Sequence, residues 1–494
     1  MIMTQEQAFL KAQAQLTDLI AFVRAAPADG LRIDQVERGL FERLLQLGLS
    51  LLTAHIAAHG DGAIGDTATA PDGQVCRKLP DPHERTYRSI FGSLTISRAA
   101  YGSREGQKIA WVPLDARLGL PAGEFSYLLE DWSLRFCLRG AFAEGRSSLA
   151  ELLGLRPSVR SLEHMSRAVA EAVPAFTDSR PTPPPHEEGE LLVLTADGKG
   201  VPMRRPPADG PRRHPRRKKG EKANKKQMAY VGAAYTVAPF VRTADQVLQE
   251  LHGAEAPPAR PRPCHKHVWA EMTRVAEGEA CHGRVELFAH LAAQRQRRDP
   301  SGQKVTVCLF DGESALWDEW LEWLGDTVGI LDVFHVLERL WDAAYCFHAE
   351  GSREAEAFVA ARLRMLLEGR VRGVVSGLRR MGTKHRLKGS KARALSVVAN
   401  YLENNEDFMR YDEYLAAGYP IGSGVAEGAC RHLVKDRLEQ TGMRWTVAGA
   451  QAMLHLRATY LNGDWEAFHE HRIQQEQRRL YHPQDQEPQF AQAG

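Results

Sequence analysis

Apolar positions recur every three to four residues in the first third of the chain, the spacing of helices with one buried face. This pattern predicts helix from about residue 5 to 58, ending at Gly60, and further helix at about 123–140. Between them, Thr86–Phe91 and Leu94–Tyr101 alternate in polarity around Gly92-Ser93, which predicts a β-hairpin over 86–101. We therefore expect residues 1–180 to form a mainly helical region with one hairpin.

A pair of helices is predicted at the end of this region. Residues 148–154 and 158–173 are joined by the tight link 155–157, and the second helix carries Arg160, His164 and Arg167. This is the outline of a helix-turn-helix, whose second helix would lie in a DNA groove. Helix pairs joined by Gly and Pro also occur in any α-rich domain, so both interpretations stay open.

The pattern changes after the Pro-rich and acidic stretch 181–190, which we interpret as a linker. Short, continuous apolar runs now alternate with helical patterns, as in a sheet buried on both faces. The predicted strands are 191–196, 227–237, a candidate third strand at 239–243, 305–310 and 328–331. The predicted helices among them are 267–297 and 314–324.

The last third of the chain is predicted to be almost entirely helical. A helical insertion spans 336–415, and two further helices cover about 424–440 and 446–472 within a C-terminal part, 416–472. The Gln- and Glu-rich tail, 473–494, is expected to be disordered.

Composition narrows the class of protein only a little. The chain has 494 residues, 43% hydrophobic and 26% charged, which suits a soluble protein of several domains. No apolar run reaches the about eighteen residues of a membrane span, and the first residues lack the features of a signal peptide. We therefore expect a cytoplasmic protein, and its seven scattered cysteines to be reduced thiols.

Charge is informative in its distribution, because the net charge is only +2. One dense basic run lies in a predicted loop, 203–226, and includes Arg216, Arg217, Lys218 and Lys219. A second basic cluster lies in the helical insertion, between Arg362 and Arg393. Such runs are either solvated surface or phosphate-binding segments, and their density favours a polyanionic partner.

Three predicted strands end in an aspartate: Asp197, Asp311 and Asp332. A single Asp-Gly after a strand is more often a turn, but ligands of open α/β sheets gather at the carboxyl ends of strands. The repetition therefore favours a shared site. Glu427, after the glycines of 420–424, is a further candidate acid in the first turn of a helix, although a salt bridge to Arg431 explains it equally well.

Four motifs occur together in a fixed order. They are Thr195-Ala-Asp-Gly-Lys-Gly-Val-Pro202, Phe310-Asp-Gly-Glu313, Leu331-Asp-Val-Phe-His-Val336, and Pro420-Ile-Gly-Ser-Gly-x-x-Glu427 with the following Lys435-x-Arg437 and Gly442-Met-Arg-Trp445. The set resembles the ISKra-type insertion-sequence transposases, DDE enzymes with an RNase H-like fold that are related to Mutator-like transposases. The resemblance covers nearly the whole chain. One departure is Gly102–Gly106, where relatives often carry a cysteine pair, so a zinc knuckle is not expected there; the irregular spacing from Cys264 to His282 does not favour a zinc site either.

The resemblance implies an α/β RNase H-like catalytic domain, 191–335 and 416–472, interrupted by the helical insertion and preceded by a DNA-binding region. It implies a catalytic triad of Asp197, Asp311 and Glu427 that binds Mg²⁺, or Mn²⁺ in its place. Asp332 then supports the site, although strand order leaves it as the alternative second acid. His335 is a positioning group, a leaving-group contact or an ordinary core histidine.

The resemblance also implies the reaction and the partners. Water attacks at the ends of the element and frees 3′-hydroxyls, which then attack target DNA. The partner is double-stranded DNA, as terminal inverted repeats and target, bound by a homodimer or higher oligomer in the bacterial nucleoid. Lys199, Arg437 and Arg444 are candidate phosphate contacts, and Trp445 stacks on bases or, as we favour, packs inside. A catalytically inactive DNA-binding regulator and a structure-specific nuclease of the same fold are the alternatives.

Overall fold

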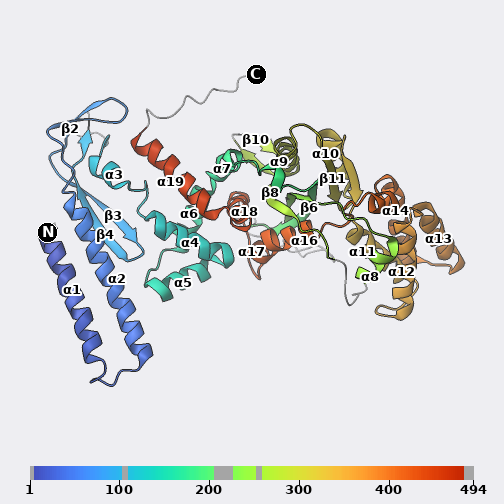
Figure 1. The fold of residues 1–494 in the computed structure, drawn as a ribbon, viewed down its shortest axis with the longest axis horizontal. Helices are drawn as coiled ribbons and strands as arrows, with labels where there is room; N and C mark the ends of the chain where they lie inside the picture. The colour runs from blue at the N-terminus through green and yellow to red at the C-terminus, as the bar shows by residue number, and fades with distance from the viewer. Residues whose placement is uncertain (1–4, 103–108, 205–225, 252–258, 277, 483–494) are drawn as a thin grey trace, which may run out of the picture. The chain divides into compact units, whose positions relative to one another are not determined.

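The computed structural model describes residues 5–102, 109–204, 226–251, 259–276 and 278–482 (Figure 1). The chain forms two compact units, Met1–Phe176 with Trp465–Gly494, and Thr177–Asp464. The predicted DNA-binding run Arg216–Lys219 lies outside the described residues. No helix in the described part of the chain is both long and apolar enough to cross a membrane. All seven cysteines are free, as expected.

The first unit begins with two long helices, α1 (Gln5–Ala25) and α2 (Ile33–Ala58), where the sequence pattern indicated one helical stretch. The predicted hairpin is formed by β3 (His83–Ser89) and β4 (Gly92–Arg98), and its turn lies at residues 90–91. A small antiparallel sheet joins β1 (Thr67–Thr69), β2 (Val75–Lys78) and β5 (Tyr101–Gly102). Arg85 and Arg98 both pair with the buried Asp115, which ties this hairpin to α3 (Pro113–Leu118).

Helices complete the first unit. They are α4 (Tyr127–Arg139), α5 (Phe142–Leu153), α6 (Val159–Ala170), the start of α7 (Val173–Ser179) and α19 (Trp465–Tyr481). The predicted helix pair is present as α5 and α6: Gly154 ends the first helix in a left-handed conformation, and Ser158 caps the second. Leu129, Leu149 and Leu162 form the apolar core under the pair.

The second unit is built on a five-stranded mixed sheet of order β12-β11-β6-β7-β8. The strands are β6 (Leu191–Pro202), β7 (Lys226–Val237), β8 (Cys264–Met272), β11 (Val305–Phe310) and β12 (Val328–Leu331). The first three pair antiparallel, and β11 and β12 run parallel to β6. The central strand is therefore the one that carries Asp197.

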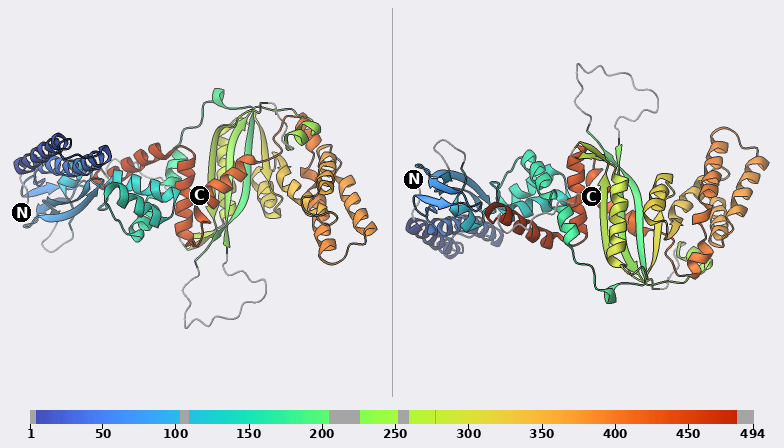
Figure 2. Two further views of the ribbon diagram at one scale, coloured as in Figure 1. Left: turned by 90° about the horizontal axis from the view of Figure 1, so that it is seen from below. Right: turned by 90° about the horizontal axis from the view of Figure 1, so that it is seen from above.

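Helices cover the faces and one edge of this sheet (Figure 2). Leu287 and Leu291 of α9 (Gly283–Arg298) fill the space above Gly232, on one face. Residues one step along the strands point to the opposite face, where α16 (Gly424–Ala429) and a π-helix, η3 (Cys430–Lys435), pack against β6. At the edge, Gln451 of α18 (Val447–Leu461) hydrogen-bonds to the backbone of Ala270 and Met272, which satisfies groups that an edge strand leaves unpaired.

The predicted helical insertion is present. It contains α11 (Val333–Ala344), α12 (Arg353–Leu367), α13 (Val371–Lys384), α14 (Gly389–Asn404) and α15 (Tyr411–Ala416), and it follows β12 directly. The shorter elements of the unit include α8 (Ala244–Leu251), β9 (Arg274–Ala276), β10 (Glu279–Cys281), α10 (Ser314–Leu324) and α17 (Asp436–Leu438).

Two predictions about this sheet were wrong. Residues 239–243 contain no strand, and the third strand, β8, lies partly inside the predicted helix 267–297. The misassignment has a physical cause, because His267 and Glu271 are polar but buried, and both have side-chain partners. Buried polar residues break the continuous apolar run that marks the other strands of the sheet.

Two predictions about the C-terminal part were also wrong. The predicted helix 446–472 is two helices, α18 and α19, separated at Gly463, which has a positive φ of 80°. The predicted disorder does not begin at 473, since α19 continues to Tyr481. Specific hydrogen bonds hold this polar segment: Gln477 donates to Gly119 O at 2.9 Å, and Tyr481 donates to Leu120 O at 2.7 Å. Residues 483–494 lie outside the described part.

Candidate functional site

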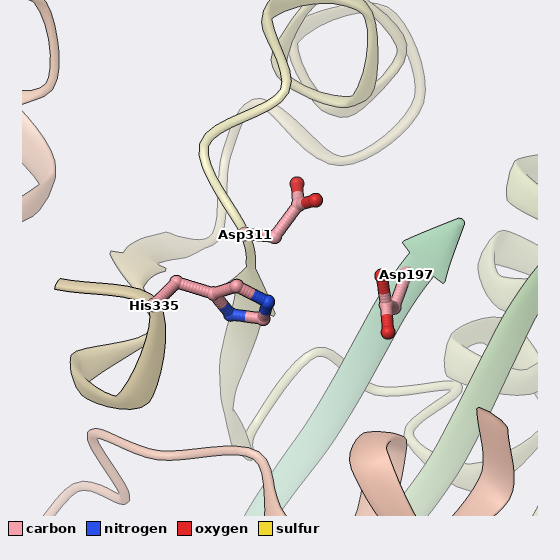
Figure 3. Close-up of side chains that lie close together, drawn as sticks. All are labelled: Asp197, Asp311 and His335. Carbon is pink, nitrogen blue, oxygen red and sulfur yellow. The ribbon is translucent and has the colours of Figure 1, made fainter. Parts of the chain in front are cut away.

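Asp197 and Asp311 lie side by side because their strands are parallel neighbours. Ala196 of β6 pairs with Phe310 of β11, so the next residue of each strand is an aspartate. The carboxyl end of β11 is at Phe310, whereas β6 continues to Pro202, which places Asp197 inside its strand instead of after it. Figure 3 shows the two carboxylates directed into the same space.

His335 joins them from the first turn of α11. One ligand atom from each of Asp197, Asp311 and His335 lies within 4.8 Å of the other two. Within the residues the structure describes, it is the only such cluster of His, Cys, Asp or Glu that could hold a metal ion, so the segment Cys264–His282 does not form one. The Nδ1 atom of His335 is buried and makes no hydrogen bond within the described part, and its ion-pair neighbour, Asp332 Oδ2, is 3.9 Å away.

Asp332 has a different position from the other two aspartates. It is only 1% exposed, and it caps α11 by accepting a hydrogen bond from Phe334 N at 2.9 Å. Its other oxygen accepts hydrogen bonds from the backbone and the hydroxyl of Ser423. One oxygen therefore caps α11 and the other holds the glycine-rich loop, and Asp332 is not in the cluster of Asp197, Asp311 and His335.

The helical insertion braces this end of the sheet. Tyr401 of α14 donates to Asp311 O at 2.8 Å, and Tyr411 donates to Leu331 O at 2.8 Å. Gly312 has a φ of 85°, and a Cβ there would lie 2.8 Å from the Tyr401 hydroxyl. A glycine is thus required next to Asp311, both for the backbone conformation and for the tyrosine.

Cys430 also contacts Asp197. It is the first residue of the π-helix and is buried, and its thiol hydrogen-bonds to the Asp197 carboxyl. Burial raises the pKa of Asp197; the bond from Cys430 opposes this shift, and the charge of Asp311 adds to it. A π-helical turn inside a helix is uncommon and often marks a functional site.

Glu427 lies one turn before Cys430, on α16, and its side chain is exposed. Burial raises the pKa of its carboxyl, as does the charge of Asp332, while His335 lowers it. Glu427 is therefore near enough to interact with these groups, but its oxygens are not in the cluster formed by Asp197, Asp311 and His335.

Sequence analysis missed two groups that face the site. The backbone N–H of Glu313 donates to Asp311 Oδ1 at 2.9 Å. Burial and the charge of Asp311 raise the pKa of the Glu313 carboxyl, and the charge of Arg284 opposes this shift. The Phe310-Asp-Gly-Glu313 motif contained a signal for Glu313, since a second acid follows the first by two residues. Nothing in the sequence indicated Cys430, which looks like an ordinary buried helix residue.

The predicted DNA contacts differ in exposure. Lys199 lies on the same face of β6 as Asp197, two residues further on, and its charge acts on Cys430. Arg444 is exposed. Arg437 is 0% exposed and lies over the Trp445 ring, with its Cζ 4.9 Å from the ring centroid, so its side chain is not open to solvent. Trp445 is also buried and donates from Nε1 to Leu438 O at 3.1 Å, the packing role that we favoured.

The chain was compared with protein families, curated proteins and solved structures. No protein-family model matches the chain, and neither does any curated protein. Among solved structures, the chain is similar to the Drosophila P element transposase strand transfer complex, at a TM-score of 0.22 and 12% identity. This match covers 72% of the present chain and 84% of the other. A TM-score this low does not establish a common fold.

Proposed function

We propose that this chain is a DNA transposase of the DDE type, which cleaves and joins DNA at the ends of an insertion sequence. The observation that carries the proposal is the convergence of Asp197 and Asp311, from neighbouring parallel strands, with His335. The strand order around them, three antiparallel strands followed by two parallel ones, agrees with the RNase H-like fold that the four sequence motifs imply.

The donor atoms suit a divalent metal ion. Two carboxylates offer the oxygen ligands that Mg²⁺ and Mn²⁺ prefer, and the buried Nδ1 of His335 has no hydrogen bond of its own within the described residues. Asp197 and Asp311 would hold the metal. When bound, such ions lower the pKa of an attacking water and neutralise charge on the phosphate.

Glu427 is the third acid of the proposed triad. Its helix continues into the π-helix that places Cys430 against Asp197, so the segment carrying Glu427 is already packed on the site. Glu313 is a further acid at the same place. We assign Cys430 and Asp332 to positioning, because the first hydrogen-bonds to Asp197 and the second holds the Ser423 loop.

The reaction consists of two displacements at phosphorus. Water first attacks a phosphodiester at the end of the element, a new P–O bond forms, and the bond to the 3′-oxygen breaks, leaving a 3′-hydroxyl. That hydroxyl then attacks a phosphodiester of target DNA in the same way. Deprotonated Asp197 and Asp311 are needed in both steps, and Lys199, on the same face of β6, would contact the phosphate.

The helical insertion supplies a surface for DNA. Residues 371–402, which form most of α13 and α14, contain eight Lys or Arg residues and no Asp or Glu. Two of the eight form ion pairs: Arg372 with Glu406, and Arg379 with Glu403. The other six are exposed and have no ion pair within the described residues; they are Arg380, Lys384, Arg386, Lys388, Lys391 and Arg393. We call these six the basic hairpin, and its charge density suits a phosphate backbone.

The test is cleavage of DNA that contains the sequences flanking this reading frame, with purified protein and Mg²⁺ or Mn²⁺. We expect nicking at the element ends and joining to a second plasmid, and a loss of at least about 10³-fold in both for Asp197→Asn and Asp311→Asn, since each removes a metal ligand. Asp318→Asn, an exposed acid on α10, is the matched control and keeps full activity.

The alternatives predict other results. Nicking without joining would identify a nuclease, and binding to the ends without cleavage under any metal would identify a regulator. If Asp197→Asn cut as fast as the wild type, the assignment of the site would be wrong.

A further inference from the structure

The two helices at the start of the chain form a hairpin with a thin core. Helices α1 and α2 run side by side in opposite directions, joined by a short turn (Figure 1). Small residues, Ala8 and Ala12, line the contact side of α1, and Phe22 lies against Gly39 of α2. Two helices alone bury little apolar surface, so such a hairpin ordinarily needs a further layer.

A stripe of large apolar residues on α1 is left uncovered. Phe9, Leu16, Ile20 and Val23 are each between 41% and 47% exposed. Their spacing of seven, four and three residues is that of a helix seam that packs against another helix. Each of these residues comes directly after a residue of α1 that faces α2. One residue is about 100° around a helix axis, so the stripe points about 100° away from the side of α1 that contacts α2.

Helix α2 has a matching stripe. Ile33, Phe41, Leu44 and Leu51 are between 47% and 82% exposed, and the last three follow Leu40, Arg43 and Ser50 of its contact side by one residue. Because the helices are antiparallel, a turn of about 100° in the direction of each chain brings both stripes to the same side of the hairpin. The β3–β4 hairpin covers a neighbouring side of α2, where Phe91 meets Gly48 and Ile96 packs in one cluster with Ile56.

We infer that this apolar face, formed by the two stripes, is the site at which a second copy of the chain binds, so that two hairpins form a four-helix bundle. At about 80–100 Å² exposed per residue, the eight residues leave roughly 700 Å² uncovered, close to the about 800 Å² per partner of a standard interface. It also exceeds the largest apolar patch of a typical monomer, about 300–600 Å². A single face that binds its own copy gives a closed, twofold dimer.

Charge argues for a second copy and against other partners. The two helices together carry five acids, Glu6, Asp18, Asp34, Glu37 and Glu42, and four bases, Lys11, Arg24, Arg38 and Arg43. The net charge of the two helices is therefore close to zero, so electrostatic repulsion between two copies is small. A helix that binds DNA phosphates or an anionic membrane needs an excess of Lys and Arg on its polar side, which this hairpin lacks.

The test is the molar mass of the full-length chain by light scattering at several concentrations. We expect a dimer for the wild type, and a shift of its dissociation constant by at least about tenfold for Leu16→Glu with Leu44→Glu. Ala14→Glu with Gln46→Glu is the control, because these exposed positions lie on the opposite sides of the same helices. All four substitutions suit a helix, and circular dichroism checks that the helices form.

A monomeric wild type at tens of micromolar would overturn the inference. So would a dimer that the stripe variant weakens no more than the control does. If Leu16→Glu prevents folding, Leu16→Gln with Leu44→Gln provides the same comparison without added charge. None of these measurements depends on catalysis, so they stand whether or not the proposed function is correct.

Discussion

Asp197 lies in surroundings that disfavour its own charge. Burial raises the pKa of its carboxyl, and the carboxylate of Asp311 beside it adds to the effect. The folded state therefore binds this proton more tightly than the unfolded chain does. The stability that this proton contributes is present at low pH and is lost as the pH rises through the raised pKa of the folded protein. At neutral pH the charged carboxylate therefore makes the folded state less stable than a neutral side chain there would.

This gives a prediction that does not need a DNA substrate. Asp197→Asn removes one of two adjacent negative charges, so its melting temperature without metal should rise by about 2–4 °C, the effect of about 1 kcal/mol in a domain of this size. Mg²⁺ or Mn²⁺ should raise the melting temperature of the wild type but not of the variant. Differential scanning fluorimetry at pH 7.5 measures both, with Asp318→Asn as the control. An equal metal-induced shift in wild type and Asp197→Asn would contradict the assignment of the ligand.

At the scale of elements, the edge of the sheet contains an unusual stack of polar rings. Trp269 of β8 lies between His290 of α9 and His455 of α18, with ring centroids 4.8 Å and 4.7 Å away. The Nε1 of Trp269 and His455 both hydrogen-bond to Glu271. Burial lowers the pKa of His290 to about 4 and that of His267 well below its usual value.

The stack predicts acid sensitivity. When folding lowers the pKa of an imidazole, the unfolded chain takes up the proton at a higher pH than the folded protein does. Between about pH 6.5 and about pH 4 only the unfolded chain is protonated, so the free energy of unfolding decreases as the pH falls through this range. For His290 the loss is about 2 kcal/mol, allowing for the part of the ring that water reaches. His290→Phe keeps a ring beside Trp269 and removes the titration, so urea denaturation between pH 7 and pH 4 should show a flatter dependence. A variant as acid-sensitive as the wild type would show that His290 is not responsible.

The basic hairpin gives a prediction about salt. Every phosphate that a protein neutralises adds about 0.9 to the slope of the logarithm of DNA affinity against the logarithm of salt concentration. Lys384→Gln with Lys388→Gln should therefore reduce that slope by up to about 2. Arg262→Gln with Lys266→Gln removes the same charge from exposed positions outside both the basic hairpin and the predicted DNA-binding region, and should leave the slope unchanged. Fluorescence anisotropy with a labelled duplex at 50–300 mM salt, a range of about sixfold, makes the comparison. Equal slopes for wild type and the Lys384 variant would exclude this surface as a DNA-binding site.

The same elements show where sequence patterns are informative. Strands β6, β11 and β12 are buried on both faces, so their continuous apolar runs and terminal aspartates predict both the strands and the convergence of Asp197 with Asp311. The apolar pattern does not predict strand β8, because the polar residues along this strand are buried with partners that come from distant parts of the chain. The π-helix and the position of Cys430 are not predictable from the sequence either, since one extra residue in a helical turn does not change the hydrophobic pattern.

At the scale of the whole molecule, the order of segments along the chain does not match the division into units. The sequence pattern assigned residues up to 472 to the catalytic part and the remainder to a disordered tail. The structure instead assigns α19 to the first unit, where Trp465 donates to Asp131 Oδ1 at 2.6 Å and Phe468 contacts Phe176. No periodicity in α19 reveals its partner, because a docking site made by residues far back in the chain is visible only in three dimensions.

The return of α19 sets the order in which a newly made chain is able to fold. The first unit is completed only after the second has been synthesised, since the whole second unit lies between Phe176 and Trp465. At about 5–20 residues per second, the ribosome needs roughly 15–60 s for that stretch. During this time the surface that receives Trp465 and Phe468 stays uncovered, together with the apolar face of α1 and α2. Two chains that are being translated from one messenger RNA would thus each already present the apolar face of α1 and α2, while the first unit of each is still incomplete.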